Sequence, residues 1–223
     1  MKAADLQTDD FMIPGKTAAM LAHEMKTPLT SIKMNVDMLC EDISLPEHKK
    51  KSLVIIQKEI ARLSKLINSF LQFSVQHEPV LTRVNLRELV EEVGALLSPV
   101  LENAGIKLIN EIGDYKIFAD HDQMKSVFIN LISNSVDAIG VNGIIETISH
   151  FDIQKKTFSI LIKDNGKGIE EKEKIFDPFF TTRNCGTGLG LPIALEIIRN
   201  HNGFLKLISS KPGETIFEIS FSI

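Results

Sequence analysis

In the first third of the chain, apolar residues recur at steps of three and four, the period of an amphipathic helix. A polar break at residues 44–47 divides the pattern into two runs. The first run comprises Leu21, Met25, Leu29, Ile32, Val36, Leu39 and Ile43, and the second comprises Leu53, Ile56, Ile60, Leu63, Ile67 and Phe70. The pattern therefore predicts two helices joined as a hairpin, with one heptad-like apolar seam on each helix.

Two helices alone bury little apolar surface, whereas two copies of a hairpin can pair as a four-helix bundle. We therefore expect a homodimer. The alternative is a hairpin that packs its seams against the C-terminal part of its own chain.

From about Val80 the period changes, and short alternating runs typical of strands alternate with helical runs. The runs typical of strands cover residues 106–112, 115–119, 143–151, 157–164, 204–209 and 215–222. Three helices are expected. The first follows the end of a strand within residues 84–103, the second runs from a cap at Asp120 to about residue 139, and the third covers residues 187–200. This order predicts an α+β protein in which the helical hairpin precedes a two-layer α/β sandwich with a mixed sheet.

The predicted organisation has three parts. Residues 1–16 read as a linker or as the end of a sensor region that is missing from the chain, residues 17–77 as the helical domain, and residues 80–223 as the sandwich domain. The stretch at residues 76–79 is the expected hinge.

Composition restricts the partners. The net charge is −4 and no long basic tract occurs, which argues against nucleic acid as a partner. No stretch reaches the roughly 18 uninterrupted apolar residues of a membrane span, so we expect no membrane contact by this segment. Cys40 and Cys185 lie far apart and fit free thiols in a reducing compartment. We expect a cytoplasmic location for this segment, and the full-length protein could be tethered to a membrane by a missing N-terminal region.

The first helix carries a candidate nucleophile. His23 lies about 200° around the helix from Leu21, so it is expected to face outward. The neighbouring Glu24 could accept its proton, and Thr27 follows on the same face one turn later, where its hydroxyl could hold a water or a phosphoryl oxygen. Pro28 removes a backbone hydrogen bond beside the histidine. The simple alternative is a solvated surface histidine.

Four segments of the second half carry candidate binding chemistry. Asn130 and Asn134 are spaced i, i+4, so both amide oxygens could converge on a Mg²⁺ ion. Asp164 ends a strand-like run and is followed by Gly166 and Gly168, so a carboxylate stands where the backbone can approach a base closely. Each feature alone has a plain interpretation, as the polar face of a helix or as a common Asp-Asn-Gly turn.

Two further segments follow in order. Residues 175–183 contain three phenylalanines, which we interpret as core residues, and Arg183, a cation suited to terminal phosphates. A glycine repeat then opens the expected last helix, where amides and the helix dipole favour an anion. It comprises Gly186, Thr187, Gly188, Leu189 and Gly190.

Together these strings resemble the sensor histidine kinases of two-component systems. The segment at residues 23–29 resembles their H-box, and the four later segments resemble the N, G1, F and G2 boxes of their ATP-binding domain, which has the Bergerat-type fold of gyrase, Hsp90 and MutL. The Phe-Phe-Thr-Thr-Arg variant and short lid look like the branch of nitrogen-regulatory and sporulation kinases. The resemblance runs from about Thr17 to the C-terminus. The family usually has alanine where Ser135 stands, a mild departure.

The resemblance implies a set of roles. His23 would be the phosphoacceptor, Glu24 the general base, and Thr27 a residue that helps to position water when phosphate is removed from the partner. Asn134 would ligate Mg²⁺ with Asn130 nearby, and Asp164 would read the adenine of ATP. The expected reaction is ATP-dependent phosphorylation of His23, followed by transfer to an aspartate in a response-regulator receiver domain.

Two alternatives use the same parts. A phosphotransfer or scaffold protein could keep the bundle with a degenerate ATP domain, although the intact Asn134, Asp164 and glycine repeat argue against it. A serine kinase or ATPase could be built on the same pocket, but neither needs the His23 string on a heptad helix.

Overall fold

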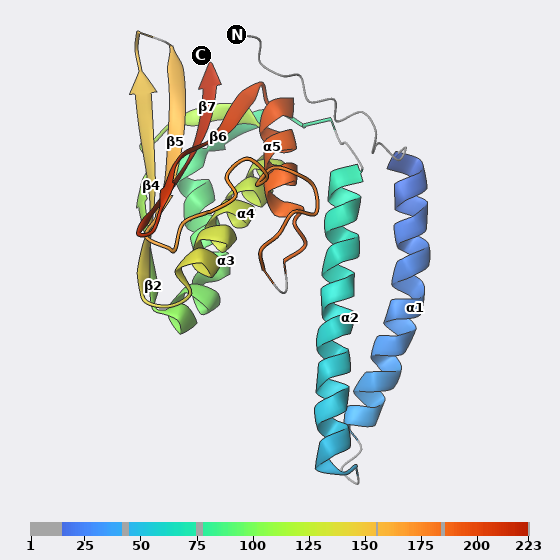
Figure 1. Ribbon diagram of the computed structural model, residues 1–223. Helices are drawn as coiled ribbons and strands as arrows, with labels where there is room; N and C mark the ends of the chain where they lie inside the picture. The colour runs from blue at the N-terminus through green and yellow to red at the C-terminus, as the bar shows by residue number, and fades with distance from the viewer. Residues whose placement is uncertain (1–14, 42–44, 75–77, 155, 184–185, 223) are drawn as a thin grey trace. The chain divides into compact units, whose positions relative to one another are not determined.

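The computed structural model describes residues 15–41, 45–74, 78–154, 156–183 and 186–222 (Figure 1). Helix α1 spans Gly15–Glu41 and α2 spans Glu47–Ser74, so the predicted helical hairpin is confirmed. Helix α1 continues through Pro28, which cannot donate a backbone hydrogen bond to the carbonyl of Glu24. No described helix is long and apolar enough to cross a bilayer.

The apolar seam of each hairpin helix is only partly buried within one chain. Val36 of α1 and Ile60 and Ile67 of α2 are buried, together with Ala22, which the pattern did not single out. The amide of Gln57 also donates to Asp37 Oδ1 across the hairpin, at 2.7 Å. The remaining residues of the seam form an exposed apolar stripe. Its members are 42–53% exposed: Met25, Ile32, Leu39, Ile56 and Leu63.

The second half forms a five-stranded mixed sheet with its helices on one face (Figure 1), as predicted. The sheet order is β2-β4-β5-β7-β6, with β2 parallel to β4 and the other neighbours antiparallel. A separate antiparallel pair joins β1 and β3. The elements are β1 Thr82–Asn85, α3 Leu86–Ala104, β2 Ile106–Glu111, β3 Lys116–Ala119, α4 His121–Ile139, β4 Gly143–Asp152, β5 Thr157–Asp164, α5 Gly190–Asn200, β6 Gly203–Lys211 and β7 Glu214–Ser222.

One helix start differs from the prediction. Helix α5 begins at Gly190 rather than at Thr187, so the glycine repeat mostly precedes the helix. Gly188 adopts φ 66°, a left-handed conformation that a regular α-helix excludes.

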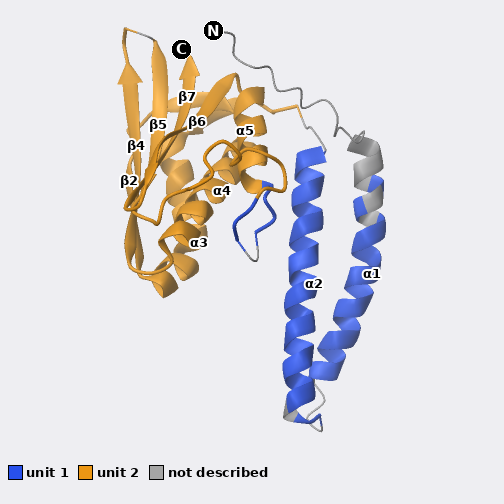
Figure 2. Ribbon diagram, viewed as in Figure 1, with its two compact units in different colours: residues 1–77, 181–189 blue, residues 78–180, 190–223 orange. Residues whose placement is uncertain are grey.

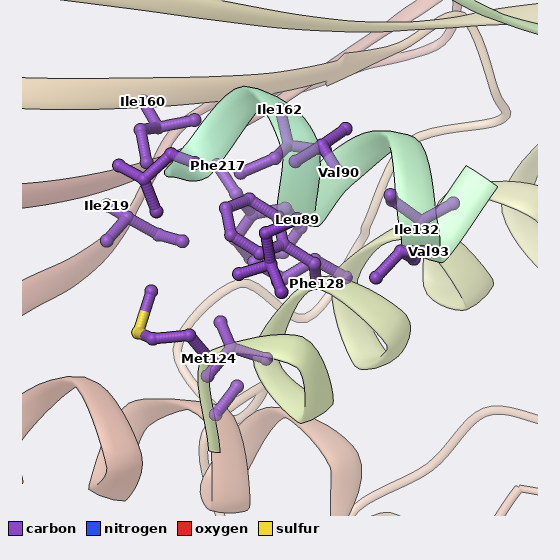
Figure 3. Packing of buried hydrophobic residues seen from close by; sticks show 14 of the residues in the cluster. Leu89, Val90, Val93, Met124, Phe128, Ile132, Ile160, Ile162, Phe217 and Ile219 are labelled. Atoms are coloured by element: carbon purple, nitrogen blue, oxygen red, sulfur yellow. The ribbon is translucent and has the colours of Figure 1, made fainter. Parts of the chain in front are cut away.

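The core of the sandwich lies between the helices and the sheet. Phe128 of α4 is fully buried, and Figure 3 shows it among side chains of α3 and of strands β5 and β7. The apolar face of α4 follows the i, i+3, i+4 spacing of an amphipathic helix. The labelled residues in this cluster are Leu89, Val90, Val93, Met124, Phe128, Ile132, Ile160, Ile162, Phe217 and Ile219.

Side-chain caps fix where the sandwich helices start. Asp120 caps α4, as predicted, by accepting a hydrogen bond from the Gln123 amide at 3.0 Å. Asn85 caps α3 by accepting from the Arg87 amide at 3.1 Å. At the other end of α3, Gly105 takes the left-handed conformation that closes a helix.

The chain divides into two compact units (Figure 2). One comprises residues 1–77 and 181–189, and the other comprises residues 78–180 and 190–223. The predicted domain limits at 16/17 and 77/80 remain a prediction, and residues 76 and 77 of the expected hinge at residues 76–79 lie outside the described residues.

Candidate functional site

The centre of the candidate site is Asp164, the last residue of β5. Its side chain is only 2% exposed. The backbone amide of Gly166 donates to Oδ1 at 2.9 Å, and the hydroxyl of Ser135 on α4 donates to Oδ2 at 3.0 Å. Each carboxylate oxygen therefore has one protein donor, and an ionised carboxylate retains lone pairs for a ligand that donates a hydrogen bond.

Burial raises the pKa of Asp164 above its ordinary value of 3.8, because the protein interior disfavours the charged form. The Gly166 amide, the Ser135 hydroxyl and the Thr215 hydroxyl act in the opposite direction. The carboxylate is thus held by neutral donors rather than by a cation, which leaves it suited to a neutral donor such as an amino group on a base.

Thr215 is the cross-strand neighbour of Asp164 in β7. It is buried, and its hydroxyl has no hydrogen bond of normal length among the described residues, although it lies near enough to lower the Asp164 pKa. A buried hydroxyl without a partner is costly in a finished core. Its position beside Asp164 makes it a candidate contact for a ligand or a bound water.

The turn after Asp164 has a backbone that leaves no room for side chains at its glycines. Asn165 Oδ1 accepts a hydrogen bond from the Ile144 amide at 2.9 Å, as a backbone carbonyl of a neighbouring strand would. A side chain at Gly166 would place a Cβ 2.7 Å from the backbone of Ala138, and Gly168 has φ 80°. Both glycines of the predicted G1 segment are therefore required by the backbone path.

Asn130 and Asn134 are both half-buried on α4. A Cβ added at Gly190, the first residue of α5, would lie 3.2 Å from Asn130 Oδ1. The structure therefore brings the end of the glycine repeat against the first asparagine of α4, and places the other asparagine next to Ser135.

Hydrogen bonds join the described residues Thr181, Arg183 and Gly186. The Arg183 amide donates to Thr181 Oγ1 at 3.1 Å, and a Cβ at Gly186 would collide with that oxygen at 2.4 Å. The Thr187 hydroxyl accepts a hydrogen bond from the amide of the buried Leu189 at 3.3 Å, and this bond helps to fix the conformation of the loop. Because these residues belong to the unit that contains the helical hairpin, their placement beside Asp164 remains a prediction.

The three phenylalanines of this segment do not all behave as core residues. Phe176 packs half-buried against the core, whereas Phe179 is 53% exposed and has φ 66°. The interpretation of all three as core is therefore wrong for Phe179. The turn around Pro178 takes its side chain out of the core, and a left-handed phenylalanine is strained.

The phosphoacceptor segment lies on α1. His23 is within the helix, but its side chain is outside the described residues, so its outward orientation remains a prediction. Glu24 and Thr27 are both exposed. Cys185 also lies outside the described residues.

The pocket residues fit an adenine nucleotide. An adenine amino group can donate to Asp164, and the unpaired Thr215 hydroxyl supplies a second polar contact. The amide oxygens of Asn130 and Asn134 fit Mg²⁺, which prefers oxygen ligands and completes its shell with water and phosphate. No cluster of three or more acidic, histidine or cysteine side chains that could hold a metal occurs in the described part of the chain. A metal here would therefore rely on amides and on the nucleotide itself.

Two side chains at the site, Ser135 and Thr215, are not among the residues that the sequence motifs predict. Both have a signal, since Ser135 stands at a buried position of the α4 period and Thr215 at an inward position of β7. A hydroxyl on an otherwise apolar inward face needs a partner.

Comparisons with known proteins identify two family domains in the chain. Residues 15–78 match the family model described as the His Kinase A (phospho-acceptor) domain. Residues 119–223 match the model described as the histidine kinase-, DNA gyrase B- and HSP90-like ATPase. The two matches cover the helical hairpin and most of the sandwich.

Three relatives illustrate the similarity. The signal transduction histidine-protein kinase AtoS of Escherichia coli (strain K12) is 38% identical over 205 residues, covering 89% of this chain and 33% of AtoS. Sporulation kinase A of Bacillus subtilis (strain 168) is 34% identical over 221 residues, covering 97% of this chain and 36% of that kinase. The crystal structure of histidine kinase ThkA in complex with the response regulator protein TrrA has a TM-score of 0.66 and 33% identity, covering 92% of this chain and 61% of that chain.

The chain spans about a third of the length of the two curated relatives. Over that length it matches both the phosphoacceptor model and the ATPase model, the first at residues 15–78 and the second at residues 119–223. The chain belongs to the histidine kinases of two-component signalling and contains their catalytic core.

Proposed function

We propose that this chain uses Mg²⁺ and ATP to phosphorylate His23 and passes the phosphoryl group to an aspartate of a response-regulator receiver domain. The observation that carries the proposal is the buried Asp164 beside the unpaired hydroxyl of Thr215, in a chain that also has the His23 string on a helix. A buried carboxylate with neutral donors and an incomplete partner set is suited to a base with an amino group.

In the proposed binding mode, Asp164 accepts a hydrogen bond from the adenine amino group. Gly166 and Gly168 let the backbone approach the ring, and Asn134 holds Mg²⁺ with Asn130 nearby. Arg183, Gly186, Thr187, Gly188, Leu189 and Gly190 contact the phosphates. Mg²⁺, when bound, would offset negative charge on the phosphates.

In the proposed reaction, a ring nitrogen of His23 attacks the γ-phosphorus of ATP and ADP leaves. Glu24 accepts the proton from the other ring nitrogen, so the product is a phosphohistidine with an uncharged ring and an anionic phosphoryl group. The receiver aspartate then attacks the same phosphorus, the bond between phosphorus and nitrogen breaks, and Glu24 returns the proton to the ring, which regenerates neutral His23. Because His23 and Asp164 belong to different units, the reaction requires the two units to approach each other.

The partner proposal is supported by a relative. ThkA forms a complex with the response regulator protein TrrA, and this chain is 33% identical to ThkA. We extend that kind of partner to this chain, together with removal of phosphate from the partner with the help of Thr27. A homodimer is supported by the exposed apolar stripe of the hairpin.

The deciding experiment is incubation with ATP labelled in the γ-phosphate. Label on the protein should be labile in acid and stable in alkali, as expected for phosphohistidine, and should be absent from His23→Gln. The matched control is His48→Gln, which changes an exposed histidine at the start of α2 and should label normally. Acid-stable label, or label retained in His23→Gln, would overturn the proposal.

A second arm tests the pocket separately. ATP binding measured by calorimetry should be present in the wild-type chain and lost in Asp164→Asn. A chain that binds no ATP would be a phosphotransfer or scaffold relative with a degenerate pocket. A panel of receiver domains incubated with the labelled protein would then identify the partner by loss of label from His23.

A further inference from the structure

We propose that Ser135 is a positioning residue that keeps Asp164 a hydrogen-bond acceptor and thereby sets the preference of the pocket for adenine over guanine. The inference rests on the proposed function, because it assumes that Asp164 contacts the base. It goes beyond that function by assigning the choice of base to a residue outside the set proposed to contact the nucleotide.

The geometry places Ser135 behind the carboxylate. The residue lies on the buried face of α4, is 2% exposed, and donates through Oγ to Asp164 Oδ2 at 3.0 Å. The other carboxylate oxygen is held by the Gly166 amide at 2.9 Å. The two donors fix the rotation of the carboxylate and use one lone pair on each oxygen.

The charge state of Asp164 decides which base it can read. An ionised carboxylate only accepts hydrogen bonds, so it matches the amino group of adenine and repels the carbonyl oxygen that guanine has at that position. A protonated carboxyl group can donate, and so it can also pair with the guanine carbonyl. A hydroxyl that donates to the ionised form therefore favours adenine over guanine.

Few groups around Asp164 favour its ionised form. Burial raises the pKa of Asp164, and the opposing groups are the Gly166 amide and the hydroxyls of Ser135 and Thr215. These come from the turn after β5, from α4 and from β7. No charged side chain of the described residues contributes, so removal of the Ser135 hydroxyl leaves only the Gly166 amide and the Thr215 hydroxyl to favour the ionised form.

The test compares ADP and GDP affinities by calorimetry between pH 5 and 8 for the wild-type chain, Ser135→Ala and Ser133→Ala. Loss of a hydrogen bond to a charged group predicts ADP binding weaker by roughly three- to tenfold in Ser135→Ala at neutral pH. The same variant should lose ADP affinity at a higher pH than wild type and should show a smaller ADP preference over GDP. Ser133→Ala changes a half-buried serine of the same helix and should match wild type.

Two outcomes separate the inference from the function beneath it. The first outcome is that Ser135→Ala equals wild type in ADP affinity, pH profile and base preference, whereas Asp164→Asn abolishes binding. This result would overturn the role of Ser135 and leave the proposed function intact. Absence of ADP binding by wild type, or full affinity in Asp164→Asn, would overturn the proposed function and the inference with it. If Ser135→Ala fails to fold, Ser135→Cys, a weaker donor of similar size, provides the same comparison.

Discussion

The backbone amide of Asp120 donates to Nε2 of His201 at 2.9 Å, joining the start of α4 to the end of α5. The other ring nitrogen, Nδ1, lies 2.7 Å from the carbonyl oxygen of Ile197. Because Nε2 accepts and a carbonyl can only accept, these two hydrogen bonds require a proton on Nδ1. His201 is buried, so both hydrogen bonds are shielded from water.

Replacing His201 by alanine should destabilise the sandwich. The Asp120 amide and the Ile197 carbonyl would both lose a partner, which predicts a loss of about 1–3 kcal/mol in unfolding free energy. Urea unfolding followed by circular dichroism measures it. The control is His121→Ala, a partly exposed histidine one residue after the cap, whose removal should change stability by less than about 0.5 kcal/mol. Equal effects of the two variants would contradict the role given to His201.

The carboxylate of Asp120 should make stability depend on acid pH. Burial alone would raise its pKa, but the amides of Gln123, Val80 and Asp122 outweigh burial and hold the pKa below 3.8. The ionised group therefore stabilises the fold at neutral pH, and this contribution is lost as the pH falls through the lowered pKa. The stability difference between wild type and Asp120→Asn should be constant near neutral pH and shrink below pH 3.8. A difference that persists unchanged to pH 2 would contradict it.

Local signals made much of the fold predictable. The Asp120 cap, the alternation of β5 and β7 and the heptad steps of the hairpin all depend on residues close in sequence, and each predicted an element that the structure contains. The start of α5 was predicted three residues early, because Gly188 interrupts an otherwise helical pattern with a left-handed residue.

The missing information concerned contacts between distant residues. Asp164 could be found from its place at a strand end, but its hydrogen bond from Ser135 spans 29 positions and its proximity to Thr215 depends on strand register. The division of the hairpin pattern into buried Ile60 and exposed Leu63 likewise depends on the crossing of two helices. The periodicity of apolar residues identifies the apolar face of a helix, but it does not show which element that face packs against.

Asp164→Asn should abolish nucleotide binding without destabilising the chain. The raised pKa of Asp164 means that its ionised form is less favourable in the folded state than in the unfolded chain. This penalty is absent at low pH and appears as the pH rises through the window between 3.8 and the raised pKa. A neutral amide avoids it, so the melting temperature at pH 7 should be equal to or above that of wild type. Lower stability together with lost binding would indicate a structural role instead.

Thr27→Ala should separate the two activities proposed for the helical hairpin. Thr27 is exposed one turn after His23, where its hydroxyl can hold a water without taking part in the attack on ATP. The rate of phosphate removal from a receiver domain should therefore fall by an order of magnitude or more, which is the size of effect expected for one group that positions a water. The rate of His23 labelling should change little. Rates of receiver dephosphorylation and of His23 labelling, measured on the same preparation, check this. Equal loss of both would contradict the separation.

The exposed apolar stripe of the hairpin should be its dimer interface. On a 3.6-residue helix, Met25, Ile32 and Leu39 of α1 lie to one side of the buried seam, and Ile56 and Leu63 of α2 lie to the same side of the hairpin. A face of this composition left in water would favour association, and a second copy presents the same face.

A charge at the centre of this stripe should therefore dissociate the dimer. In a two-fold dimer both copies carry Ile32→Glu at the interface. Each copy loses the stabilisation from burying one isoleucine, about 1.5–3 kcal/mol, before the cost of burying the charge is added. Sedimentation equilibrium should show a dimer for wild type and a monomer for Ile32→Glu at micromolar concentration. Ile55→Glu is the matched control, because Ile55 is 62% exposed on a different face of α2 and should leave the dimer intact. A monomeric wild type would contradict the dimer itself. Dissociation by Ile55→Glu but not by Ile32→Glu would place the interface on another face, since only burial of the stripe makes the charge at residue 32 costly.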